Sequence, residues 1–235
     1  MTRPETLVPY SAHPAFAKAA KVLGVELHQI ALDDACRARV DEAEKLVNEN
    51  TVLLVGSAPN YPFGTVDPIP ELSQLAHARG ISFHTDSCLG GFLLPFYEKL
   101  GEPVPPFDFR VPGVTTLSAD VHKYGYCTKG ASVILHREDA QLKQHQLFFW
   151  DRWPGGLYAS LAMAGARPAA PIAAAWAVMQ YLGEEGWHLD RQKDPDALHL
   201  MVSPEHDRIV DLFLGDLREA VAHHGISKGA EARYS

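Results

Sequence analysis

The chain has 235 residues and a formal net charge of −8, so it lacks the basic excess with which a general nucleic-acid binder neutralises phosphates. Its 46% hydrophobic content is typical of a soluble globular protein with one large domain or slightly more. The three cysteines, Cys36, Cys88 and Cys127, have no CxxC spacing, which indicates free thiols in a reducing compartment. No segment reads as a signal peptide or as a membrane span, so the cytoplasm is the expected location.

Short apolar runs alternate with helical patterns along the first third of the chain. Strands are expected over residues 6–10, 25–32, 51–55 and 81–86, and helices over residues 14–23, 35–48 and 67–78. This β-α-β alternation predicts an α/β fold, with a mostly parallel sheet flanked by helices.

The rest of the chain predicts a less regular order of elements. We expect strands over 111–119, 131–136 and 197–202, and helices over 138–149, 171–182 and 207–223. Residues 150–156 are expected to form an aromatic and glycine-rich loop, and residues 187–196 an irregular polar segment. Two domains are therefore predicted, a large one over 1–186 and a small one over 187–235.

Candidate site residues follow several of the expected strands. His13 falls in the first turn between a strand and a helix, Ser57 and Asp86 follow apolar strands, and Lys123 lies in the loop 117–130. Parallel α/β sheets bind ligands at the carboxyl ends of their strands, so these residues are expected to converge. Ser57 fits an ordinary polar loop residue equally well, whereas Asp86 leads directly into a small-residue turn.

Lys123 is the residue around which this site is predicted. It lies at a strand end between His122 and Tyr124, where partial desolvation disfavours the ammonium form, as a lysine that forms a Schiff base requires. Together with Asp86 and His13 it suits pyridoxal phosphate, in which an aspartate pairs with the pyridine nitrogen. A Schiff base without cofactor, as in class I aldolases, or a general-base site fits the same residues.

Residues 118–125, Ser-Ala-Asp-Val-His-Lys-Tyr-Gly, closely resemble the lysine motif of the group II pyridoxal-phosphate decarboxylase superfamily. The fuller resemblance is to its sphingosine-1-phosphate lyase branch, and it runs in collinear order over residues 5–186. The further segments that carry it are 11–16, 56–59 with 64–68, 84–92, 105–114 and 153–158.

This resemblance implies a fold-type I enzyme that dimerises, with its active site at the subunit interface. It implies that Lys123 binds pyridoxal 5'-phosphate as a Schiff base, that Asp86 pairs with the pyridinium nitrogen and that His13 stacks on the ring. His13 could instead only cap a helix.

The resemblance also assigns residues beside the lysine. It implies that His122 and Ser118 line the cofactor cleft near the phosphate or the lysine, and that Lys129 is a second lysine that handles the substrate. A solvated loop lysine is the alternative reading of Lys129. Ser57, at its strand end, completes the set of candidate cofactor-binding residues, and no metal site is expected.

The implied reaction is a retro-aldol cleavage of a phosphorylated sphingoid base to a long-chain aldehyde and phosphoethanolamine. An amino-acid decarboxylase is the closest alternative enzyme. A truncated, non-catalytic paralogue that acts as an interaction subunit is the alternative from another class of protein.

Two departures from the family pattern support that last alternative. Nothing before Ser11 resembles the family's glycine- and Ser/Thr-containing loop that grips the cofactor phosphate. The resemblance also jumps near residues 186–187, so that 187–235 is expected to be a remnant of the family's small carboxy-terminal domain. Loss of the phosphate loop removes charge-assisted hydrogen bonds that contribute roughly 1.5–3 kcal/mol each.

Overall fold

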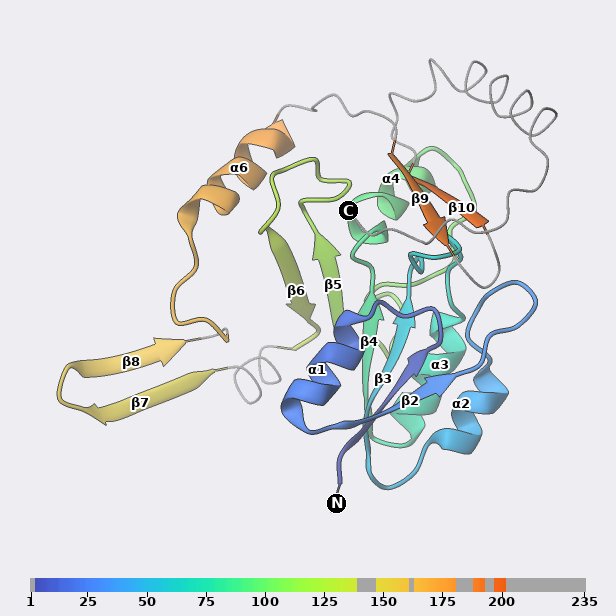
Figure 1. Cartoon of the computed structure of the whole chain (residues 1–235), viewed down its shortest axis with the longest axis horizontal. Coiled ribbons are helices and arrows are strands. Elements are labelled where there is room, and N and C mark those ends of the chain that lie inside the picture. Colours follow the sequence, from blue (N-terminus) through green and yellow to red (C-terminus); the bar gives the residue numbers. More distant parts are fainter. Residues whose placement is uncertain (1–2, 139–146, 161–162, 181–187, 193–196, 202–235) are drawn as a thin grey trace. The chain divides into compact units, whose positions relative to one another are not determined.

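Six strands in the order β2-β1-β3-β4-β5-β6 form the main sheet of the computed structural model (Figure 1). The structure describes residues 3–138, 147–160, 163–180, 188–192 and 197–201. Neighbours among the first five strands run parallel, and β6 is antiparallel to β5. The strands are β1 (Glu5–Pro9), β2 (Glu26–Ile30), β3 (Thr51–Ser57), β4 (Ser82–Asp86), β5 (Thr116–Asp120) and β6 (Ser132–His136). The predicted mostly parallel α/β sheet is therefore confirmed.

Helices pack on opposite faces of this sheet. The ring of Phe16 packs edge-on against that of His84, with 6.0 Å between the ring centroids, so α1 covers the face that carries His84. On the other face, a Cβ at Gly56 would meet Ile69 at 2.6 Å, so the absent side chain lets α3 pack closely on β3. The helices of this region are α1 (Ala15–Leu23), α2 (Val40–Leu46), α3 (Ile69–Ala78), the 3₁₀ turn η1 (Gly90–Phe92) and α4 (Leu94–Lys99).

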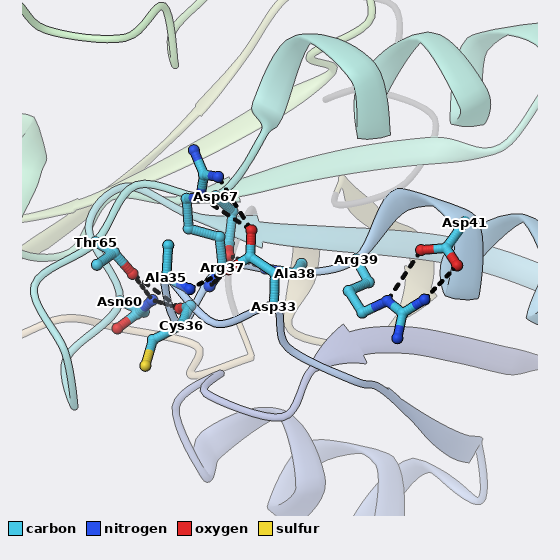
Figure 2. Close-up of polar contacts among 10 residues, drawn as sticks. All are labelled: Asp33, Ala35, Cys36, Arg37, Ala38, Arg39, Asp41, Asn60, Thr65 and Asp67. Carbon is cyan, nitrogen blue, oxygen red and sulfur yellow. Dashed lines mark hydrogen bonds and ion pairs between the residues drawn. The ribbon is translucent and has the colours of Figure 1, made fainter.

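Helix α2 is shorter than the predicted helix over 35–48, and the side chain of Asp33 explains the difference (Figure 2). Its Oδ1 accepts the N–H groups of Ala35 at 3.0 Å and Arg37 at 2.9 Å, and its Oδ2 pairs with the Arg37 guanidinium at 3.0 Å. Aspartate that bonds nearby backbone N–H groups in this way competes with helix formation. Cys36 takes a left-handed conformation with φ of 58°, so the chain turns before the helix begins.

Asp67 ties this loop to the end of β3. Its carboxyl group, in a residue only 1% exposed, accepts the N–H of Ala38 at 2.8 Å (Figure 2). It also accepts the N–H of Ser57 at 2.7 Å. Burial raises the pKa of Asp67 to about 6, because desolvation of the anion outweighs the two hydrogen bonds that favour it. The side chain therefore fixes the strand end at Ser57 while remaining partly protonated near neutral pH.

The raised pKa of Asp67 predicts a specific pH dependence of stability. The folded-state pKa of about 6 exceeds the value of 3.8 for an unperturbed aspartate. The contribution of Asp67 to the free energy of unfolding is therefore fully present below about pH 4 and is lost as the pH rises through 6. The shift corresponds to a loss of about 3 kcal/mol of unfolding free energy over that interval. We expect Asp67→Asn to abolish this component, measured as the difference between the two proteins in urea-unfolding free energy from pH 4 to 7. An identical pH slope in both proteins would contradict the assignment.

The region after β6 differs from the expectation. Strands β7 (Phe148–Trp153) and β8 (Gly156–Ser160) form an antiparallel hairpin. The prediction of a helix through residue 149 is therefore wrong at its end, and the loop over 150–156 is wrong at both ends; residues 139–146 lie outside the described part. Aromatic side chains favour strands, and Gly156, with φ of 103°, allows the reversal. The predicted helix over 171–182 is confirmed by α6 (Ala169–Gln180).

The chain divides into two units, Met1–Tyr181 and Leu182–Ser235. In the second, β9 (His188–Gln192) pairs antiparallel with β10 (Ala197–Met201). The strand predicted over 197–202 is confirmed, and the irregular segment predicted over 187–196 is wrong where β9 lies. The helix predicted over 207–223 lies outside the described residues. None of the helices that the structure describes is long and apolar enough to cross a bilayer.

Candidate active site

Four of the predicted site residues lie at the carboxyl edge of the sheet. Because β1, β3, β4 and β5 run parallel, their carboxyl ends share one edge. His13 follows β1, Ser57 and Asp86 are the last residues of β3 and β4, and Lys123 lies three residues after β5. The structure therefore places these side chains where open α/β sheets bind ligands.

Asp86 is a buried carboxylate with a fixed orientation. Its Oδ1 accepts the N–H of Cys88 at 3.1 Å and the hydroxyl of Ser118 at 3.3 Å. Ser118 is the register partner of Asp86 on the neighbouring strand, which explains why the two side chains meet. Both of these hydrogen bonds go to Oδ1, so Oδ2 can accept a further donor.

Ser57 is fixed from both sides at the end of β3. Its N–H donates to Asp67 as described above, and the next N–H, of Ala58, donates to the carbonyl of Asp86 at 2.8 Å. A Cβ at Gly90 would collide with the carbonyl oxygen of Ala58, so the turn after β4 needs glycine there. Ser57 itself is only 2% exposed. What these hydrogen bonds fix at the site is therefore the position of its backbone. Its direct contact with a cofactor stays a prediction.

Lys123 lies in the turn after β5 and forms an ion pair with Asp120. Its Nζ is 2.9 Å from Asp120 Oδ2, and its side chain is 26% exposed, in agreement with the expected partial desolvation. Burial acts to raise the pKa of Asp120, but the hydrogen bonds from Ser132 and Lys123 outweigh it and lower that pKa. Asp120 is thus an anion that holds the lysine amine.

His122 also lies beside Asp120. The Nδ1 of His122 donates to the carbonyl oxygen of Ala131 at 2.8 Å, and its Nε2 lies 3.6 Å from Asp120 Oδ2. The sequence reasoning missed Asp120, although it lies inside the quoted lysine motif. Its spacing of three residues from Lys123, typical of a side-chain pair in a turn, is the signal that could have found it.

His13 and Lys129 are the two exposed members of the predicted site. His13 Nδ1 accepts the N–H of Ala15 at 3.1 Å, so the ring is fixed at the start of α1. This contact is the helix-end role considered from the sequence, and it is compatible with one ring face binding a ligand. Lys129 lies in the turn before β6 and makes no ion pair with any residue that the structure describes.

His84 is a second residue that the sequence reasoning missed. Its Nδ1 lies 2.8 Å from the Thr116 hydroxyl and its Nε2 3.2 Å from that of Ser118. Burial lowers the pKa of His84, and His136 acts in the same direction against the opposing effect of Asp86. The imidazole is therefore neutral and is held against the residue that orients Asp86.

The sequence profile of the "Pyridoxal-dependent decarboxylase conserved domain" matches residues 1–192. The chain belongs to this family. The curated Arabidopsis thaliana sphingosine-1-phosphate lyase is 39% identical over 94% of the chain and 51% of its own length. The Rattus norvegicus sphingosine-1-phosphate lyase 1 is 43% identical over 91% of the chain and 38% of its own length.

Comparison with solved structures also finds a lyase and a decarboxylase. The structure of the Burkholderia pseudomallei sphingosine-1-phosphate lyase superposes with a TM-score of 0.87 at 36% identity, over 94% of this chain and 64% of that one. The Lactobacillus brevis glutamate decarboxylase, with a TM-score of 0.63 at 22% identity, shares the fold. This chain therefore has the predicted lyase and decarboxylase fold.

The chain spans about half the length of the Arabidopsis relative. That alignment runs over 277 positions, more than the 235 residues of this chain, so it includes positions that the relative has and this chain lacks.

Pyridoxal phosphate is the cofactor of this family, and the described residues fit it. Lys123 offers a half-buried amine for the aldehyde carbon, and Asp86 offers a buried carboxylate for the pyridine N–H. His13 offers a fixed imidazole at the same edge of the sheet. An amine, a carboxylate and a flat ring are the groups that this cofactor needs around its ring.

Proposed function

We propose that the chain is a pyridoxal-phosphate-dependent lyase that cleaves phosphorylated sphingoid bases to a long-chain aldehyde and phosphoethanolamine. The observation that carries the proposal is the half-buried Lys123 amine at the same sheet edge as the fixed carboxylate of Asp86. The names of the relatives at 39% and 43% identity supply the substrate class.

The residues divide the chemistry between them. When bound, the cofactor supplies an electron-withdrawing ring that accepts the electron pair of the broken C2–C3 bond. Asp86 would favour the protonated form of the ring nitrogen through its carboxylate. Lys123 would hold the cofactor through Nζ until the substrate amine replaces it, and Asp120, 2.9 Å from that atom, would then hold the lysine amine. His13 would pack against the ring, and Lys129 would contact the substrate.

A homodimer with its site at the subunit interface is part of this proposal. Its support is the hairpin β7–β8, whose side chains Phe148, Phe149, Trp153 and Leu157 are all at least half exposed. Exposed apolar surface of this kind is typical of protein interfaces. A reducing compartment, the cytoplasm, stays the expected location because Cys36, Cys88 and Cys127 are all free.

Incubation of the purified protein with pyridoxal phosphate, then with sphinganine 1-phosphate, tests the proposal. We expect a visible absorbance band from protein-bound cofactor that borohydride removes, followed by release of an aldehyde. Release of carbon dioxide from glutamate or an aromatic amino acid, without aldehyde, would indicate a decarboxylase instead. Absence of both the band and the products would identify the chain as the non-catalytic paralogue.

A further inference from the structure

A continuous line of hydrogen bonds crosses β4 and β5 behind Asp86. It runs from Asp86 Oδ1 to the Ser118 hydroxyl at 3.3 Å, on to His84 Nε2 at 3.2 Å, and from His84 Nδ1 to the Thr116 hydroxyl at 2.8 Å. The register pairs His84 with Thr116 and Asp86 with Ser118, so these four side chains share one face of the sheet. The line is therefore built by two adjacent strands.

The numbers of hydrogen bonds that the Ser118 hydroxyl can donate and accept decide the direction of each bond. A hydroxyl donates one proton and accepts two, and the Ser118 proton goes to Asp86, which as a carboxylate can only accept. His84 must then donate from Nε2, and its bare Nδ1 accepts the Thr116 proton. The Cys88 thiol lies 3.4 Å from the Ser118 oxygen and also interacts with the Asp86 carboxylate. Burial raises the pKa of that thiol to about 12, so the thiol keeps its proton.

The surroundings of His84 support a neutral imidazole with one defined tautomer. The residue is 8% exposed and its ring packs edge-on against Phe16. Burial lowers its pKa, and a hydroxyl group engages each of its two nitrogens. The histidine is thus a fixed donor and not a proton carrier.

We propose that His84 is a positioning residue that acts through Ser118: by occupying the hydroxyl oxygen, it commits the Ser118 proton to Asp86 Oδ1 and leaves Oδ2 for the cofactor's ring nitrogen. The cofactor part of this inference rests on the proposed function. The hydrogen-bond line itself does not, since it joins only residues of the chain.

Nitrogen-15 NMR of the histidine rings in the cofactor-free protein tests the line directly. We expect His84 to show a protonated Nε2 and a bare Nδ1 at pH 7, and to keep this tautomer below the ordinary histidine pKa of about 6.5, because burial lowers its pKa. His28, in the edge strand β2, is the control histidine for the variants. A protonated Nδ1, or a doubly protonated ring at pH 7, would overturn the proposal whatever the protein catalyses.

Cofactor titrations of four variants and one control variant test whether His84 acts through Ser118. We expect Ser118→Ala and His84→Phe each to raise the dissociation constant of pyridoxal phosphate about tenfold, the effect of one hydrogen bond of roughly 1.4 kcal/mol. The double variant should be no weaker than Ser118→Ala alone. His84→Gln, whose amide reaches the place of Nε2, should stay within about threefold of the unaltered protein. The matched control His28→Gln should not change the dissociation constant.

Two outcomes of this series would reject a positioning role. Additive effects in the double variant would mean that His84 acts independently of Ser118, and equal losses in His84→Gln and His84→Phe would mean that only ring packing matters. If the unaltered protein binds no pyridoxal phosphate, the proposed function fails, while the NMR result still decides the hydrogen-bond line.

Discussion

Lys123→Ala abolishes the borohydride-stable attachment of pyridoxal phosphate to the protein. We expect this complete loss because Lys123 is the lysine that the structure places beside an anchored carboxylate at the site edge, with its Nζ 2.9 Å from Asp120. The measurement is intact mass after incubation with the cofactor and reduction. The unaltered protein gains one reduced cofactor, and the variant gains none.

Lys129→Ala is the matched control for this experiment. Lys129 lies six residues further along the same segment but is exposed, and it makes no ion pair with the residues that the structure describes. We expect it to keep full attachment and to lose substrate affinity only. If the cofactor still attached to Lys123→Ala but not to Lys129→Ala, Lys129 would be the lysine that binds the cofactor and the assignment of Lys123 would be wrong.

Asp86→Asn is expected to lower the rate of substrate cleavage by about 100-fold or more. The variant keeps an oxygen for Cys88 and Ser118, but it places an amide N–H where Oδ2 meets the ring nitrogen. A charge-assisted hydrogen bond of roughly 1.5–3 kcal/mol is lost, and two donors then face each other, so the ring cannot hold its proton. Steady-state kinetics with saturating cofactor measure the loss.

Asp108→Asn provides the comparison for this prediction. Asp108 is also a hydrogen-bonded aspartate, but it pairs with Arg110, 2.9 Å away, in the segment before β5. The substitution removes the same charge from the protein and should leave the cleavage rate within about twofold, as surface pairs contribute little. An Asp86→Asn protein as active as Asp108→Asn would remove Asp86 from the mechanism.

The strands of the sheet were predictable because each is a short apolar run with a turn signal after it. The end of β4 at Asp86 followed from these patterns alone, whereas β3 continues to Ser57, two residues beyond the predicted strand over 51–55. The parallel order then places both strand ends at one edge of the sheet. The early part of the predicted helix over 35–48 was wrong because Asp33 bonds the backbone locally, which helical periodicity does not register. The hairpin β7–β8 was missed because its aromatic residues were assigned to a helix and a loop.

Cross-strand contacts account for what the sequence could not show about the site. His84 and Ser118 are 34 positions apart, and they meet only because β4 and β5 pair in one register. The resemblance named Ser118 but gave no reason for His84. The role of Asp120 could not be predicted without the turn after β5, which brings Lys123 back toward this residue. Each missed residue therefore depends on strand pairing or on a turn.

Strand β6 has a consequence for handling the isolated protein. Among the described residues it pairs only with β5, and its side chains Val133, Ile134 and Leu135 are 38%, 49% and 46% exposed. An apolar strand with one open edge is a template for β-pairing between molecules, and such segments drive aggregation. Expression of this polypeptide without a partner that covers that edge will therefore favour inclusion bodies. The substitution Ile134→Lys, which places a charge on this exposed strand, is expected to counter the aggregation.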